Sequence, residues 1–120
     1  MDEGTRHEPA RDPEDLSRFV VERLNAGEVD GLVALYEPDA VMALPNGRTA
    51  TGGEEIRAAY EKFVAGQLVV DRGNQQTTLR WRGLAFTSSR LPDGTIIVEV
   101  ARQQADGTWL WVIDQPSING

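Results

Sequence analysis

The spacing of apolar residues divides the chain into a helical first half and a strand-rich second half. Apolar side chains recur at helical intervals over residues 12–27, 28–36 and 54–65. After residue 77, apolar runs are separated by the turn sequences Pro-Asp-Gly and Asp-Gly, which is typical of an antiparallel meander. The pattern therefore predicts one α+β domain in which N-terminal helices cover a sheet.

The ends of the first two predicted helices are marked by residues with clear positional preferences. Asp12 is expected to cap the first helix, with Pro13 at its first position, and Gly27 is expected to end it. The second helix is predicted to run to about Tyr36, because Pro38 disfavours helical geometry at the residue before it.

A short hairpin is predicted between the second and third helices. Residues 40–44 are an apolar run, the sequence Pro-Asn-Gly at 45–47 favours a turn, and residues 48–51 return as a second short strand. Gly52 and Gly53 end that strand, and a helix follows. Later strands are predicted at residues 68–71, 77–81, 84–91, 96–104 and 109–114.

The first eleven residues are polar and contain no periodic apolar residue, so residues 1–11 are expected to be a flexible tail and residues 12–120 a single domain. His7, in this tail, is the only histidine and the chain has no cysteine, so neither a metal site nor a cofactor is expected. The polar N-terminus does not read as a signal peptide, and a cytoplasmic protein is expected.

Charge is distributed unevenly along the chain, whose formal net charge is −7. Residues 1–39 hold eleven acids and four arginines, whereas the remaining 81 residues hold eight acids and eight bases. There is no basic cluster, which argues against binding to nucleic acid or to anionic membranes. No apolar run approaches the ~20 residues of a membrane span.

The order of helix, small hairpin and helix resembles the nuclear transport factor 2-like superfamily, which includes ketosteroid isomerases and SnoaL-like polyketide cyclases. The resemblance rests on Ala-Leu-Tyr, Asp-Ala-Val, Pro-Asn-Gly and Gly-Gly-Glu-Glu-Ile-Arg, in that order, and covers about residues 13–117. It implies a cone-shaped α+β fold in which three helices pack on a curved antiparallel or mixed sheet. This fold hosts catalysts, binding modules and assembly domains alike, so the function has to be argued from the site.

The ketosteroid isomerase pattern is kept only in part. The resemblance places the supporting tyrosines at Tyr36 and Tyr60 and the protonated acid near Glu99. It places the main oxyanion donor at Val20 and the general base at Leu44, and neither side chain can do that work. Classical steroid isomerisation is therefore not expected.

Two acids in otherwise apolar strands are the candidate catalytic residues. Glu99 either faces a cavity, where burial would raise its pKa, or pairs across strands with Arg82 or Arg90. Asp114 is predicted by alternation to share a strand face with Val112, and it either approaches Glu99 or caps a strand end in solvent.

A ligand pocket is expected between the helices and the sheet. The predicted lining residues are Val20, Tyr36, Met42, Leu44, Tyr60, Phe63, Trp81 and Val112. The last strand is apolar on both faces, with Trp109 and Trp111 opposite Leu110 and Val112. The second face predicts a homodimer, because exposed apolar patches mark interfaces.

Three functions remain open from the sequence. The first is binding of a small hydrophobic or polycyclic ligand without chemistry, favoured by the missing base at Leu44. The second is a SnoaL-like isomerase or cyclase that uses Glu99 or Asp114 as acid–base. The third is a dimeric assembly domain with a vestigial pocket. A ligand-sized cavity would argue against the third function, and a buried carboxyl group within it would favour the second.

Overall fold

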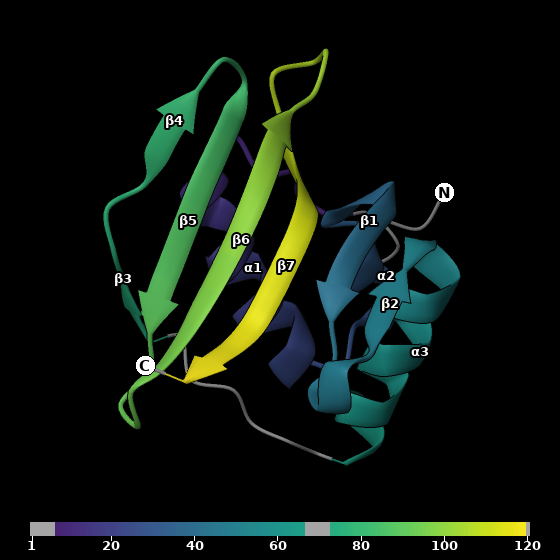
Figure 1. The fold of residues 1–120 in the computed structure, drawn as a ribbon. Helices are drawn as coiled ribbons and strands as arrows, with labels where there is room; N and C mark the ends of the chain where they lie inside the picture. Colours follow the sequence, from purple (N-terminus) through teal and green to yellow (C-terminus); the bar gives the residue numbers. More distant parts are fainter. Residues whose placement is uncertain (1–6, 67–72, 120) are drawn as a thin grey trace, which may run out of the picture.

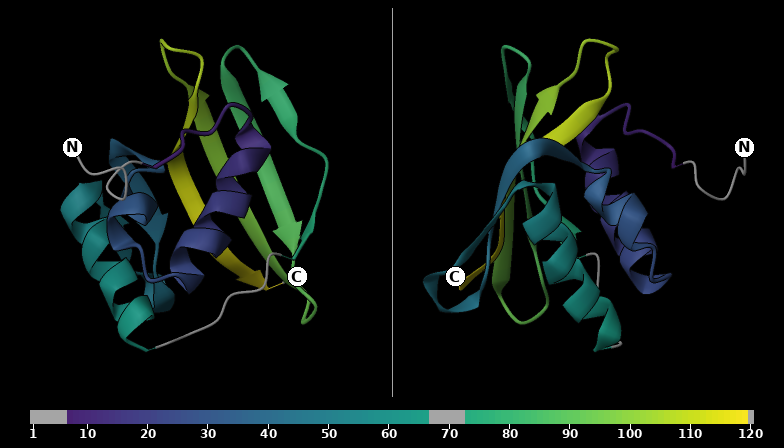
Figure 2. Two further views of the ribbon diagram at one scale, coloured as in Figure 1. Left: turned by 180° about the vertical axis from the view of Figure 1, so that it is seen from behind. Right: turned by 90° about the vertical axis from the view of Figure 1, so that its right-hand side faces the viewer.

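The computed structural model describes residues 7–66 and 73–119, which form one curved sheet with helices packed against one of its faces (Figure 1). Seen from behind and from the side, the helices all lie on the same face, and the other face of the sheet is uncovered (Figure 2). This arrangement confirms the predicted α+β architecture of helices on a curved sheet.

The helices of the described part are α1 (Pro13–Asn25), α2 (Val29–Val33) and α3 (Gly52–Ala65). The start of α1 is as predicted, because the Asp12 N–H donates to Asp15 Oδ2 at 3.1 Å and Pro13 occupies the first helical position. None of these helices is long and apolar enough to cross a membrane. α3 packs on β1 and β2, while α1 packs on β5 and β7.

Within the described residues the sheet has seven strands in the order β2-β1-β7-β6-β5-β3, and β4 pairs with β5 beside β3. β1 and β7 are parallel, and every other pair is antiparallel, so the sheet is mixed. The bounds are β1 (Tyr36–Ala43), β2 (Thr49–Thr51), β3 (Asn74–Gln75), β4 (Leu79–Trp81), β5 (Leu84–Arg90), β6 (Thr95–Gln103) and β7 (Trp109–Asn119).

The hydrophobic core lies between the helices and the inner face of the sheet. Leu16 of α1, Leu32 of α2 and Ile56 of α3 are each fully buried, and Trp111 of β7 packs with them in the same core cluster. Full burial of one such side chain contributes about 1.5–3 kcal/mol relative to leaving it exposed, so each helix is held to the sheet mainly by this face.

The segment just before α1 contacts the rest of the domain. Ala10 is buried, and its carbonyl oxygen accepts a hydrogen bond from the Trp109 N–H at 2.9 Å. Arg23 donates to the Glu8 carbonyl oxygen at 2.6 Å and to the Gly31 carbonyl oxygen at 2.8 Å. Part of the predicted tail is therefore joined to the domain by backbone hydrogen bonds, which need no periodic apolar pattern. Residues 1–6 lie outside the described residues.

The position of Tyr36 differs from the prediction. α2 ends at Val33, and Tyr36 is the first residue of β1, with its side chain on the buried face. Pro38 lies inside this strand, where the pairing between β1 and β7 is irregular, because proline has no N–H to donate to the ladder. The strand predicted at residues 68–71 falls outside the described residues.

A row of apolar side chains crosses the uncovered face of the sheet from one strand to the next. The strand registers pair Val41 with Ile113, Ile113 with Val100, Val100 with Phe86, and Phe86 with Leu79. Leu79, Phe86 and Ile113 are exposed, and Trp81 beside them is 65% exposed. No helix of the described part covers this row (Figure 1).

Candidate functional site

A cavity of about 790 Å³ opens between α1, α3 and the inner face of the sheet. α1 supplies one wall through Ser17, Val20 and Leu24, and α3 supplies another through Tyr60 and Phe63. The rim comes from the β1–β2 hairpin, including Leu44 and Arg48. The walls are mainly apolar, whereas the floor on the sheet carries carboxyl groups, a combination that is typical of small-molecule sites.

The floor of the cavity is a second row across the sheet, on the inner face. The registers pair Thr87 with Glu99, Glu99 with Asp114, and Asp114 with Met42. Met42, Glu99 and Asp114 line the cavity, and the two acids are 4% and 5% exposed. The structure therefore brings together two acids that lie fifteen positions apart in the sequence, as neighbours on adjacent strands.

A β-bulge in β7 determines which residues reach this floor. Val100 pairs with Ile113, but Ala101 pairs with Trp111, so Val112 is an extra residue on β7. Trp111 and Asp114 consequently both face inward, although an uninterrupted alternation would place them on opposite faces. The prediction that Val112 and Asp114 share a face assumed unbroken alternation, which this bulge interrupts, and Val112 is not among the lining residues.

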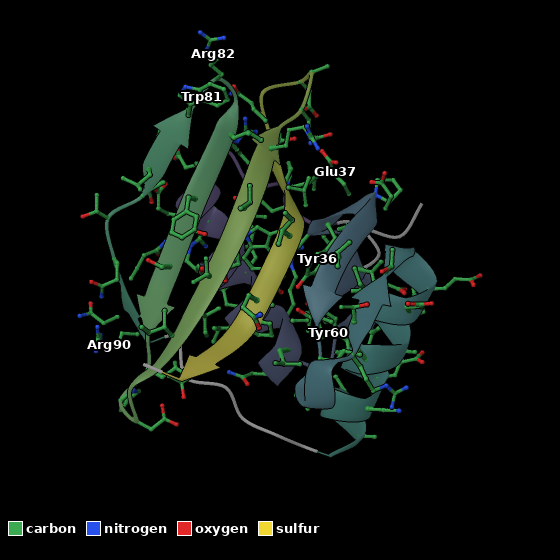
Figure 3. The ribbon with its side chains drawn as sticks, in the orientation of Figure 1. Tyr36, Glu37, Tyr60, Trp81, Arg82 and Arg90 are labelled. Carbon is green, nitrogen blue, oxygen red and sulfur yellow. The ribbon has the colours of Figure 1, made fainter. Side chains whose placement is uncertain are left out.

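Two tyrosines form a hydrogen-bonded chain behind Asp114. The Tyr36 hydroxyl donates to Asp114 Oδ2 at 2.6 Å and lies 2.6 Å from the Tyr60 hydroxyl. Because Tyr36 has a single proton and gives it to Asp114, Tyr60 is the donor to Tyr36. Figure 3 labels both tyrosines beside β1. Tyr36 thus supports the floor from behind rather than lining the cavity.

Glu99 has a different environment from Asp114. Its Oε1 accepts a hydrogen bond from the Thr87 hydroxyl at 2.7 Å. Arg90 is exposed, and the Arg82 guanidinium lies over the Trp81 ring at 5.1 Å, so neither arginine pairs with Glu99. Figure 3 places both arginines at the ends of β5, away from the tyrosine pair. Among the described residues, no ion pair to Glu99 is present, and the pairing with Arg82 or Arg90 is not found.

Burial changes the proton affinity of both carboxyl groups in the same direction. Burial, reinforced by the nearby charge of Asp114, raises the pKa of Glu99 from 4.5 to about 8, against the opposing Thr87 hydrogen bond. Burial raises the pKa of Asp114 from 3.8 to about 6, and the Tyr36 hydrogen bond opposes this rise. At neutral pH the floor therefore holds a protonated Glu99 beside an ionised Asp114.

The predicted pocket residues divide into three groups. Val20, Met42, Leu44, Tyr60 and Phe63 line the cavity, together with Glu99 and Asp114. Tyr36 and Val112 lie in the adjoining strands without lining it. Trp81 lies on the uncovered outer face, since its register partner is Leu84 of β5, and Figure 3 shows it at the turn between β4 and β5.

Several polar residues of the site were not proposed as site residues from the sequence. Ser17, Ser89, Arg48 and Gln115 line the cavity, and Thr87 supports Glu99. A signal for some of them exists in β5, where small or polar residues alternate with larger ones from Leu84 to Arg90. Small side chains on the inner face leave room for a cavity, and that pattern could have identified the cavity face of this strand.

The sequence matches a known protein family. Residues 16–82, more than half of the chain, match the family of SnoaL-like domains. The chain belongs to the SnoaL-like domain family. A comparison with curated proteins gave no match. The matched segment contains most of α1, the β1–β2 hairpin and α3, and therefore most of the cavity wall, but neither Glu99 nor Asp114.

Solved structures place this SnoaL-like domain in the same fold group. A ketosteroid isomerase-like protein from Erwinia carotovora is 18% identical, with a TM-score of 0.64 over 85% of this chain and 89% of that one. A SnoaL-like protein of unknown function from Burkholderia thailandensis is 18% identical, with a TM-score of 0.59 over 89% and 94%. A protein with a cystatin-like fold from Nostoc punctiforme is 16% identical, with a TM-score of 0.69 over 86% and 85%. At these identities the likeness establishes the fold alone.

Proposed function

We propose that this SnoaL-like domain binds a small apolar molecule that carries a carbonyl group, and catalyses proton transfer at that group. The observation that supports the proposal is the pair of buried carboxyl groups, Glu99 and Asp114, side by side on the floor of a ligand-sized cavity. A protonated acid next to an ionised one is the combination that acid–base catalysis requires.

The proposed step is enolisation. Asp114 removes a proton from the carbon next to the carbonyl, while the Glu99 carboxyl group donates its proton to the carbonyl oxygen. The product is the neutral enol, and the reverse transfers return the protons. The Tyr60–Tyr36 chain holds Asp114 in place through Oδ2. This assignment does not need a base at Leu44 or a donor at Val20, where ketosteroid isomerases carry theirs.

Deuterium exchange into a simple ketone tests this proposal. Deoxybenzoin, an apolar ketone with acidic α-hydrogens, is incubated with the protein in D₂O, and loss of the α-proton NMR signal is followed. We expect exchange faster than in buffer alone. Asp114→Asn and Glu99→Gln should each lower the protein-dependent rate roughly 100-fold, the usual contribution of a general acid or base.

Asp39→Asn provides the matched control, because Asp39 is an exposed acid on β1, outside the cavity lining. This variant should exchange deuterium at the wild-type rate. Binding of deoxybenzoin with exchange no faster than in buffer would contradict the catalytic step and leave ligand binding without chemistry. Ligand binding without chemistry is the alternative function that the aliphatic residues Val20 and Leu44 on the cavity wall favour.

We also propose that the uncovered sheet face pairs with the same face of a second copy of the chain. The support is the apolar row from Val41 to Leu79, whose exposed members are large hydrophobic side chains. A row that runs across the strands can face its own copy after a two-fold rotation, as an isologous interface requires. Exposed patches of this kind are typical of interfaces.

Light scattering at micromolar concentration should therefore give twice the chain mass of 13.2 kDa. Phe86→Lys places a charge in the row and should give the monomer mass. Phe63→Lys is the matched control, because Phe63 is similarly exposed but lies on α3, and this variant should remain dimeric. A monomeric wild-type protein would contradict the proposed pairing.

A further inference from the structure

One oxygen of the buried Asp114 is left without a partner. Oδ2 accepts the Tyr36 hydroxyl, whereas Oδ1 has no hydrogen-bond partner among the described residues and is shielded from solvent. Trp111 Nε1, on another residue of the cavity wall, is likewise buried without a partner in the described part. A buried polar atom without a partner costs about 1–3 kcal/mol, and more when charged, so these atoms need an explanation.

The neighbouring Glu99 does not supply the missing bond. Glu99 and Asp114 are direct cross-strand partners, so their Cβ atoms are about 5 Å apart. Even so, Asp114 Oδ1 has no hydrogen-bond partner among the described residues, and the hydrogen bond described for Glu99 is the one from Thr87. Both side chains line the cavity, so a ligand bound in the cavity lies next to them.

We infer that the ligand carries a hydroxyl group on the carbon next to its carbonyl group, so that the hydroxyl donates to Asp114 Oδ1 while the carbonyl accepts from Glu99. The inference rests on the proposed function and names its substrate class as α-hydroxyketones. The two oxygen atoms of such a ligand are carried by adjacent carbons, which suits a donor and an acceptor side chain on adjacent strands. The remaining, mainly apolar walls fit the hydrocarbon part of the molecule.

This ligand class also determines which carbon reacts. The carbon that bears the hydroxyl group is held beside Asp114, the base of the proposed step. Removal of its proton, with protonation of the carbonyl oxygen by Glu99, gives an enediol. Asp114 then returns its proton to the other carbon while Glu99 takes the proton of the original hydroxyl group, which becomes the new carbonyl, and both side chains regain their starting states. The isomerisation is balanced without any oxidant or reductant.

A series of ligands with one carbon skeleton tests the inference on the wild-type protein. Benzoin has the carbonyl and the adjacent hydroxyl, deoxybenzoin has only the carbonyl, and bibenzyl has neither. We expect calorimetric titration to show benzoin binding about tenfold or more tightly than deoxybenzoin, the value of a hydrogen bond to a charged group. Bibenzyl should bind more weakly than deoxybenzoin.

Two variants identify the atoms responsible. In Asp114→Asn the amide oxygen can accept the Tyr36 proton, which turns the amide nitrogen, a donor, toward the place of Oδ1. The ratio of the affinities for benzoin and deoxybenzoin should then fall to about one. Glu99→Gln is the matched control, because its amide still accepts from Thr87 and still offers a donor, so the preference should persist.

Equal affinity of the wild-type protein for benzoin and deoxybenzoin would overturn the inference and leave the proposed function standing. An unchanged preference for benzoin over deoxybenzoin in Asp114→Asn would also overturn it, because a group other than Asp114 would then accept the hydrogen bond of the ligand hydroxyl. Failure of all three compounds to bind would instead contradict the proposed function itself. The comparison of ligands on the wild-type protein tests the inference even if Asp114→Asn does not fold.

Discussion

Glu99→Gln is expected to make the protein more stable at pH 8 and to change its stability little near pH 4. Burial raises the pKa of Glu99 to about 8 in the folded state, whereas in the unfolded chain it lies near 4.3. Between these two values the folded protein holds a proton that the unfolded chain has released. Stability of the wild-type protein therefore falls as pH rises through this window, by about 1.4 kcal/mol per pH unit.

The whole window corresponds to a loss on the order of 5 kcal/mol in the wild-type protein, which Glu99→Gln removes. The glutamine still accepts the Thr87 hydroxyl, so no hydrogen bond is lost. Urea unfolding of both proteins at pH 4.5 and pH 8 measures the difference. Asp114 adds a similar slope up to about pH 6 in both proteins, and the comparison cancels it to first order. Lower stability of the variant at pH 8 would mean that an ionised Glu99 stabilises the fold.

Tyr36→Phe is expected to cost about 2–3 kcal/mol of stability at pH 8, because it leaves an ionised, buried Asp114 without any donor. Loss of that donor also raises the pKa of Asp114 further, since the Tyr36 hydrogen bond opposes the effect of burial. The penalty should therefore shrink toward pH 4, where the folded protein holds Asp114 protonated. Chemical unfolding of both proteins at pH 8 and pH 4 measures the loss of stability at each pH.

Tyr60→Phe serves as the matched control for this variant. The Tyr60 hydroxyl bonds to Tyr36 and does not reach Asp114 directly. Its loss should cost about 1 kcal/mol, the usual net value of a neutral hydrogen bond, with little dependence on pH. If the two phenylalanine variants lost equal stability at both pH values, the chain from Tyr60 through Tyr36 to Asp114 would not be the support described above.

The fold could be predicted from the sequence because local signals agreed with one another. Asp12 and Pro13 mark the start of α1, and the helical spacing of apolar residues gave the helices their buried faces. The turn sequences between the long strands similarly fixed the meander. The first residue of β1 was misplaced, because a proline two residues beyond Tyr36 interrupts a strand as readily as it ends a helix.

The site was predicted in part. Glu99 could be found because one acid in an apolar strand has few explanations. The pairing of Glu99 with Asp114 depends on the strand register, and the inward orientation of Asp114 depends on an extra residue in β7. The alternation of apolar and polar residues contains no sign of that bulge, so the cavity neighbours of Asp114 could not be predicted from it. Trp81 was assigned to the pocket because aromatic residues suit both a pocket and an outer sheet face, and only the register of β4 on β5 decides between them.

At neutral pH the cavity floor should hold a protonated Glu99 beside an ionised Asp114. The direct measurement is the ¹³C NMR shift of the Glu99 side-chain carboxyl carbon, followed from pH 3 to pH 10 and assigned by its absence in Glu99→Gln. The main titration step of Glu99 should have a midpoint near pH 8, with a smaller inflection near pH 6 as Asp114 ionises. A single midpoint near 4.3, the value of a solvent-exposed glutamate, would contradict the account.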